Sequence, residues 1–144
     1  MNRKLNKLDK KITCWMRDHG VRYLRYSLAI VFIWFGLLKP LGWSPASGLV
    51  ANTVYLLNPS WFVPFLGWWE VLIGVCLLRR SWIRVGIFLM AIQMVGTFLP
   101  LVLLPEVTWT GFMTLTLEGQ YIIKNLVLIS AALVVGSHVR DGKC

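Results

Sequence analysis

The sequence predicts an all-α integral membrane protein built as a bundle of four membrane-spanning helices. Three observations support this prediction. The 144-residue chain is 57% hydrophobic and only 15% charged, with a mean hydropathy of +0.65, whereas soluble domains average about 25% charged residues. Its apolar residues form four long runs, which favours a membrane protein over a soluble core. Its basic residues lie almost entirely outside these runs. A chain of this length forms one domain.

The four apolar runs are close to the length of about 17–25 residues that a helix needs to cross a bilayer. Asn58, Pro59 and Ser60 provide a stop and a cap before the second run, and Pro64 is tolerable in its first turn. Pro100 and Pro105 bend or end the third run. The predicted spans are residues 23–39, 61–78, 82–104 and 119–139.

The basic residues predict the orientation of these spans. Of the fifteen Lys and Arg residues, eight precede the first run, three lie between the second and third, and two follow the fourth. The loops at residues 40–60 and 105–118 contain none. Because basic loops stay on the cytoplasmic side, we expect both termini inside. The net charge of +9 therefore indicates topology, and no nucleic-acid partner is expected, because no zinc-finger or RNA-binding motif is present.

Residues 1–21 form a basic amino-terminal segment at the inner membrane surface, before a transmembrane domain at residues 22–139 and a short tail at 140–144. Two interpretations of the first segment stay open: an amphipathic helix on the inner leaflet, or a frayed basic tail that only sets topology. No small-residue cleavage site of a signal peptide follows it. The helical spacing is carried by Leu5, Leu8, Ile12 and Trp15 or Met16.

Both outer loops contain apolar segments that are too short to span a membrane. They are residues 47–57 and 107–117. Because unpaired backbone is costly in lipid, we expect short interfacial or re-entrant segments that cap the outer end of the bundle.

Charged residues in or at the ends of the apolar runs are the most informative feature of the chain. A charge within the membrane costs about 2.5–3.5 kcal/mol on insertion scales. At about 1.5 Å of rise per residue, Glu70 and Gln93 fall near mid-membrane. Lys39 and Lys124 fall in the outer part, and Glu118 lies at the outer mouth. The predicted arrangement is a stack of alternating charge layers.

In each span a polar residue shares a helical face with small residues. Small residues allow helices to approach closely, and polar residues belong inside a bundle. This pattern predicts a polar interior. The four faces are Ala29, Phe32 or Ile33, Gly36 and Lys39; Gly67, Glu70 and Gly74; Gly86, Met90, Gln93 and Thr97; and Tyr121, Lys124 or Asn125, Leu128, Ala132 and Gly136.

Two interpretations of the polar residues remain open. They form a site for a small polar or amphipathic ligand, with Glu70 able to carry a proton, or they form ion pairs that hold the bundle together. Direct contact of Glu70 with Lys39 or Lys124 would favour ion pairs. For Glu70 with Gln93 we favour the ligand site. For Lys39 alone we favour a structural role, in which its side chain snorkels outward. For Lys124 we favour neither interpretation. The predicted cluster is Glu70, Lys39, Lys124, Gln93, Asn125 and Glu118, with no catalytic residue assigned.

The sequence lacks the motifs that mark haem sites, metal sites or paired cysteines. The two histidines, His19 and His138, lie at predicted span ends, so no intramembrane pair for haem is expected, and no metal site is expected either. The three cysteines are odd in number and form no C-x-x-C motif, so no structural disulfide is expected. They are Cys14, Cys76 and Cys144.

Several stretches resemble a known membrane family. Residues 25–39 (RYSLAIVFIWFGLLK) look like the first-helix signature of the bacterial YkgB-type proteins, which are related to the DoxX-like group. The match continues in order with residues 50–52 (VAN), 69–74 (WEVLIG) and 121–126 (YIIKNL). The first outer loop is shorter than in the longer YkgB-type members. The resemblance implies a small four-span protein of the bacterial inner (plasma) membrane.

The resemblance also implies a function. Members are linked to oxidative or reactive-chlorine stress and, in the DoxX branch, to quinone-dependent sulfur oxidation. The leading hypothesis is therefore a protein that binds a small amphipathic ligand, with a quinone as a candidate cofactor, and that is not an enzyme by itself. The second is a non-catalytic partner or assembly chaperone of a larger membrane complex. The third is a small transporter that acts as a homo-oligomer.

Overall fold

The computed structural model describes residues 3–53 and 58–139. The predictions for residues 54–57 and for the tail at 140–144, Cys144 included, therefore lie outside the described residues. The described chain is mostly helical and contains four helical segments that are long and apolar enough to cross a membrane. The predicted four-helix architecture is thus confirmed at this level. The four segments are Leu5–Leu38, Pro59–Leu78, Arg80–Leu103 and Leu117–Ser137.

The first span and the basic segment before it form one helix, α1 (Arg3–Leu38). Of the two interpretations of the amino-terminal segment, the structure supports a helix over its described part. The helix ends before Pro40, which has no backbone N–H and disfavours helical conformation in the preceding residue. A turn follows, in which Trp43 N donates to Leu38 O at 2.9 Å and Gly42 adopts a positive φ of 74°.

The second span is α3 (Pro59–Leu78), and its predicted cap is confirmed. Asn58 Oδ1 accepts a hydrogen bond from Ser60 N at 3.1 Å, which satisfies one of the free N–H groups of the first turn. The helix ends at Arg79, and the short 3-10 helix η1 (Arg80–Trp82) connects it to the next span.

The third and fourth spans are each interrupted once. The third consists of α4 (Ile83–Phe98) and α5 (Pro100–Leu103), because Pro100 has no N–H for the helical ladder. The fourth consists of α7 (Leu117–Ile123) and α8 (Asn125–Ser137). The break falls at Lys124, whose backbone stays right-handed helical, so the chain keeps its direction.

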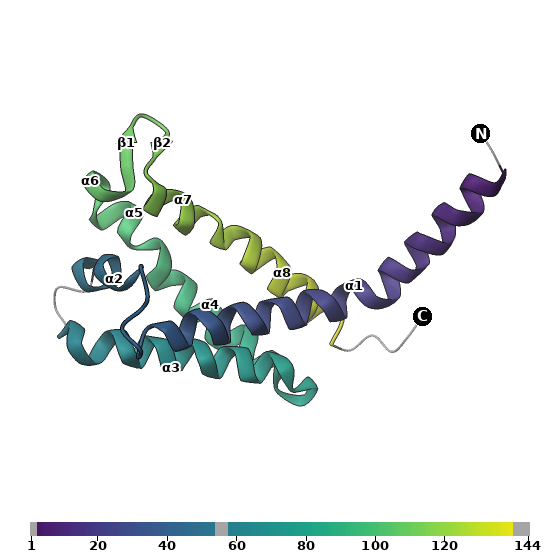
Figure 1. Ribbon diagram of the computed structural model, residues 1–144, viewed down its shortest axis with the longest axis horizontal. Coiled ribbons are helices and arrows are strands. Elements are labelled where there is room, and N and C mark those ends of the chain that lie inside the picture. The colour runs from purple at the N-terminus through teal and green to yellow at the C-terminus, as the bar shows by residue number, and fades with distance from the viewer. Residues whose placement is uncertain (1–2, 54–57, 140–144) are drawn as a thin grey trace.

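Glycine residues allow the helices of the bundle to pack closely. The most extensive helix contact is between α1 and α3, and α8 packs against α1 and α4 (Figure 1). A Cβ atom on Gly67 would lie 2.6 Å from Gly36 O, and one on Gly36 would lie 2.7 Å from Gly67 O. Gly74 similarly faces Ala29 O at 2.7 Å. The predicted small-residue faces of the first two spans therefore form the α1–α3 interface.

The end of the bundle opposite the amino terminus is covered by short elements, which we call the cap. They are α2 (Ser47–Thr53), α6 (Pro105–Thr108) and a hairpin of β1 (Trp109–Gly111) with β2 (Thr114–Leu115). The antiparallel hairpin departs from the all-α prediction. Thr108 is completely buried, and a Cβ on Gly119 would lie 2.2 Å from its carbonyl oxygen, so α7 packs tightly on α6.

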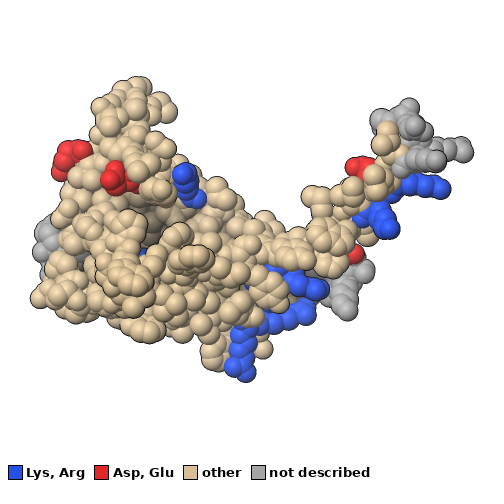
Figure 2. All heavy atoms as spheres, viewed as in Figure 1, with Lys and Arg blue, Asp and Glu red and all other residues tan. Residues whose placement is uncertain are grey.

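The surface of the bundle is mostly apolar. Figure 2 shows few charges over the body of the bundle, whereas Lys and Arg gather on the extended part of α1 and at the end of the bundle from which it extends. Large apolar side chains are exposed on every span, including Trp34 at 65%, Phe88 at 64% and Leu133 at 66%. Such a continuous apolar surface is expected of helices solvated by lipid.

Candidate functional site

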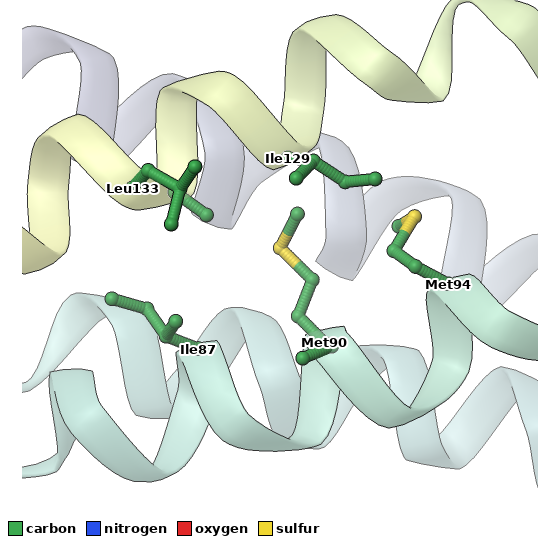
Figure 3. Close-up of a pocket in the computed structure, with 7 residues that line it drawn as sticks. Ile87, Met90, Met94, Ile129 and Leu133 are labelled. Carbon is green, nitrogen blue, oxygen red and sulfur yellow. The ribbon is translucent and has the colours of Figure 1, made fainter.

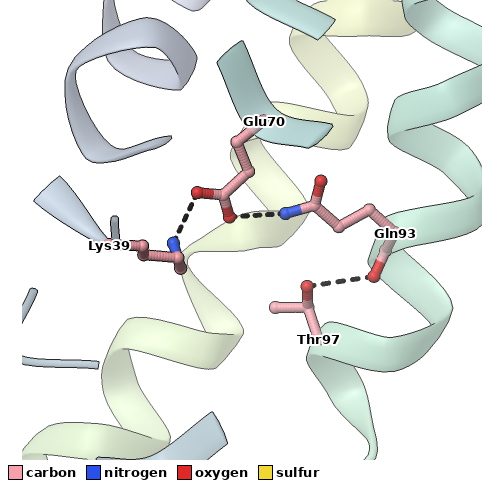
Figure 4. Close-up of polar contacts among 4 residues, drawn as sticks. All are labelled: Lys39, Glu70, Gln93 and Thr97. Carbon is pink, nitrogen blue, oxygen red and sulfur yellow. Dashed lines mark hydrogen bonds and ion pairs between the residues drawn. The ribbon is translucent and has the colours of Figure 1, made fainter. Parts of the chain in front are cut away.

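Three polar residues from three elements meet inside the bundle, and we call them the polar triad: Lys39, Glu70 and Gln93. Glu70 lies in the middle of α3, on the same buried face as Gly67 and Gly74. Gln93 lies on α4, and Lys39 follows the last residue of α1. In Figure 4, Lys39 and Gln93 flank Glu70 from opposite sides.

Glu70 accepts one contact on each carboxylate oxygen. Lys39 Nζ forms an ion pair with Glu70 Oε2, and Gln93 Nε2 donates to Glu70 Oε1 at 2.6 Å. Thr97 Oγ1 donates to the backbone oxygen of Gln93 at 3.1 Å, one turn further along α4 (Figure 4). Lys39 and Glu70 are each only 8% exposed. The triad therefore links α1, α3 and α4 through charge-assisted contacts, which are stronger than hydrogen bonds between neutral groups.

The direct contact between Lys39 and Glu70 favours the ion-pair interpretation for these two residues. Lys39 does not extend outward as expected, because its side chain turns into the bundle. Each charge offsets the cost of burying the other, and removing one partner would leave an uncompensated charge. The pair has a structural role whatever else the site does.

The other predicted members of the cluster lie apart from the triad. Lys124 is exposed, with Nζ 4.9 Å from the centre of the Tyr121 ring. Asn125 Nδ2 donates to the backbone oxygens of Tyr121 and Ile122 at 3.2 and 3.1 Å, and Glu118 is exposed. The predicted stack of charge layers is therefore not formed.

The orientation of the fourth span explains this difference. Its first part, α7, buries Gly119 and Ile122 and ends just before Lys124. Lys124 lies two residues after Ile122, which is a rotation of about 200° around a helix. Its side chain therefore points away from the bundle rather than toward Glu70.

The amide oxygen of Gln93 is the unusual atom of the site. Oε1 is buried and has no hydrogen-bond partner among the described residues. The carboxylate of Glu70 determines the orientation of this amide, because the NH2 group and not the oxygen must face a negatively charged acceptor. Buried polar atoms almost always have a partner in the protein or its ligands and waters. Gln93 therefore presents an acceptor beside the ion pair.

An apolar crevice of about 70 Å³ lies between α4 and α8 (Figure 3). Met90 and Met94, which precede and follow Gln93 on α4, line it together with Ile129 of α8. A cavity of about 150 Å³ is known to bind benzene. The crevice is less than half that size, so it accommodates part of an alkyl chain but not a ring. The remaining lining residues are Ile87, Ala91, Ala132 and Leu133.

A second concavity, of about 270 Å³, lies on the surface of α1. All of its lining residues come from this one helix, so it is a surface groove rather than a cavity between elements. They are Ile30, Val31, Trp34 and Phe35.

Sequence reasoning found all three members of the triad and did not select the residues around them. The sequence pattern puts Thr97 on the same helical face as Gln93, and its position one turn away indicates that it belongs to the site, although the predicted cluster does not include it. Met90 was likewise on that face, and Met94 is the neighbour of Gln93 in sequence. Within residues 3–53 and 58–139, no group of three or more His, Cys, Asp or Glu side chains could hold a metal ion.

The fold and the surface define the class: four helices that are long and apolar enough to cross a membrane mark a multi-pass membrane protein. No family model, curated protein or solved structure matches the chain. The resemblance to the YkgB-type and DoxX-like proteins therefore stays a prediction.

Proposed function

We propose that this chain is a DoxX/YkgB-like protein that binds a small amphipathic ligand at the polar triad. The polar group of the ligand lies at Gln93 and Glu70, and part of its alkyl chain lies in the crevice lined by Met90 and Met94. The protein has no catalytic residue of its own in this proposal. It acts in a redox or stress-resistance context by binding its ligand within the membrane.

The observation that carries this proposal is the buried acceptor at Gln93 Oε1. A ligand hydroxyl would donate a hydrogen bond to this oxygen. The reduced form of a quinone has such hydroxyl groups, whereas the oxidised form does not. The carbonyl groups of an oxidised quinone would need donors, and Lys39 Nζ and Gln93 Nε2 have hydrogens beyond those used on Glu70. Because the crevice is too small for a ring, the ring would lie beside Gln93 and only the chain would enter the crevice.

The same proposal includes an orientation in the bacterial inner membrane. Both termini lie in the cytoplasm, and the cap lies outside, as interfacial segments. The distribution of Lys and Arg supports this orientation, because the described segments of the cap contain none. Cys14 is exposed, so a membrane-impermeant thiol reagent should label it only from the cytoplasmic side. Labelling from outside would contradict the orientation.

Mass spectrometry of small molecules that co-purify with the protein tests the ligand site. The wild-type protein is compared with Gln93→Leu, which keeps the approximate size and removes the amide. Loss of one hydrogen bond to the ligand, worth about 1.4 kcal/mol, would lower the bound amount about tenfold. We expect a hydroxyl-bearing amphipathic molecule with the wild type and about a tenth of it with Gln93→Leu.

Thr97→Val is the matched control for this experiment. Thr97 lies one turn from Gln93, and its hydroxyl bonds only to its own helix, so this variant should retain the ligand. Equal elution profiles of all three proteins in size-exclusion chromatography exclude unfolding as the cause. If the bound molecules are the same in Gln93→Leu and the wild type, the ligand-site proposal is wrong.

A second candidate function, a non-catalytic partner of another membrane protein, is favoured by the tip of the hairpin. Phe112 is 96% exposed and Met113 is 80% exposed, and residues 107–117 contain no charge. If this tip binds a partner, Phe112→Ser with Met113→Ser should abolish a stoichiometric complex that the wild type forms in mild detergent. Thr110→Ser is the control, and an unchanged complex in the double variant would contradict this function.

A further inference from the structure

The amino-terminal part of α1 has no partner within the described chain. Figure 1 shows it extending beyond the other three spans. Residues 5–18 are all exposed, including Trp15 at 53% and Leu5 at 61%. Apolar side chains of this size on an isolated helix require a surface that covers them.

The apolar residues of this helical segment form one continuous face. At about 100° per residue, they fall within an arc of about 100°, and the basic residues fall opposite this arc or at its edge. Asp9 and Asp18 are the only acidic residues in the segment. The apolar arc contains Leu5, Leu8, Ile12, Trp15 and Met16. Opposite it lie Lys7, Lys10 and Arg17, and at its edge lie Lys11 and Arg22.

We propose that this segment lies on an anionic lipid surface, at the side of the membrane from which α1 starts. Lipid satisfies both sides of the helix, because acyl chains cover the apolar arc and anionic headgroups attract the flanking basic residues. The inference does not depend on the proposed ligand site.

A second copy of the chain is the less favoured occupant. Leu5, Leu8, Ile12 and Trp15 have the spacing of a coiled-coil seam, but they cover only about two heptads. A parallel pair would also place two strongly basic helices side by side, where like charges repel. Charge therefore opposes the dimer and supports binding to anionic lipid.

Gly20 provides the joint that this arrangement requires. A Cβ atom on Gly20 would meet nothing within 4 Å, so packing does not require glycine here, unlike at Gly36 or Gly67. Glycine in a helix lowers its stiffness, and Gly20 lies between the amphipathic segment and the buried part of α1. Trp15, His19 and Tyr23 form a row of rings across this joint. The first pair is stacked with centroids 5.2 Å apart, and the second is tilted with centroids 6.5 Å apart. Aromatic rings of this kind favour the membrane interface.

Spin-label accessibility in vesicles tests the proposal with the full chain. Single-cysteine variants carry a nitroxide at position 8 (Leu8→Cys), position 10 (Lys10→Cys) or the native Cys14, with the other cysteines replaced by serine or alanine. The vesicles contain phosphatidylcholine alone or phosphatidylcholine mixed with phosphatidylglycerol. In the anionic vesicles we expect position 8 to be accessible to oxygen in lipid, and positions 10 and 14 to an aqueous nickel reagent.

Two variants separate the contributions of charge and of the joint. Replacing Lys7, Lys10 and Lys11 by glutamine should remove the contrast between positions 8 and 14 in anionic vesicles. Gly20→Ala, which fits without a steric clash, should reduce this difference in accessibility between positions 8 and 14. Equal access of the nickel reagent to positions 8 and 14 of the unmodified segment would overturn the proposal. So would dipolar broadening between labels at position 8, which would show a second copy as the occupant.

Discussion

Glu70 connects three elements through the two oxygens of one carboxylate. Its partners come from the end of α1 and the middle of α4, so the side chain is both a buried charge and a joint between helices. The pair with Lys39 is buried at 8% exposure on each side. Because both charges are removed from water, neither is stable there alone.

A double-mutant cycle measures this dependence. Lys39→Met leaves the Glu70 carboxylate without its cation and should lower the free energy of unfolding by about 3–5 kcal/mol. The double variant Lys39→Met with Glu70→Gln carries no buried charge and should be more stable than Lys39→Met alone. Unfolding by denaturing detergent in mixed micelles gives the free energies. Additive effects of the two substitutions would show that the residues do not interact.

The buried positions of Glu70 and Gln93 could be predicted from sequence because each lies on a regular helical face with small residues. Gly67 and Gly74 place Glu70 inside, and Met90 does the same for Gln93. Lys124 could not be assigned in this way. Tyr121 and Lys124 share a face with Ala132 only in an uninterrupted ideal helix, and the fourth span is interrupted at Lys124 itself.

At the scale of the element, α1 and α3 pack closely because the glycines at their interface have no side chains. Backbone approaches backbone at Gly36 and Gly67, which is the mode of packing typical of small residues in membrane helices. This close approach brings the end of α1, and with it Lys39, near Glu70.

Alanine substitutions test this interface. Gly67→Ala would place a Cβ atom 2.6 Å from Gly36 O, and we expect a loss of about 1–3 kcal/mol in the free energy of unfolding. Gly96→Ala is the matched control in α4, because a Cβ there meets nothing within 4 Å. It should be neutral or stabilising by up to about 1 kcal/mol. Equal effects of both variants would contradict the role of the close contact.

The limits of the helices were predictable where proline or a cap determines them, as at Asn58, Pro40 and Pro100. The hairpin was not predictable, because its two-residue turn is Phe112–Met113 and lacks the Asn-Gly or Gly-Gly pairs that mark hairpin turns. Met113 adopts a positive φ of 55°, which non-glycine residues seldom do.

At the scale of the whole molecule, the apolar surface of four spans surrounds a small polar interior. The buried parts of the spans were predictable in outline, since apolar runs and proline positions determine them. Which lysine enters the polar interior was not predictable, because it depends on the directions in which the side chains of Lys39 and Lys124 turn. One lysine enters the bundle and the other leaves it.

The most direct test of this account is solid-state NMR of the protein in lipid bilayers, with 15N-labelled lysine and 13C-labelled glutamate. The account predicts a strong dipolar coupling between Lys39 Nζ and the Glu70 carboxyl carbon, because these groups form the one Lys–Glu ion pair among the described residues. Lys39→Gln assigns the signal by removing it. A Lys39 side chain without this coupling, and in exchange with water, would contradict the polar triad at the centre of the account.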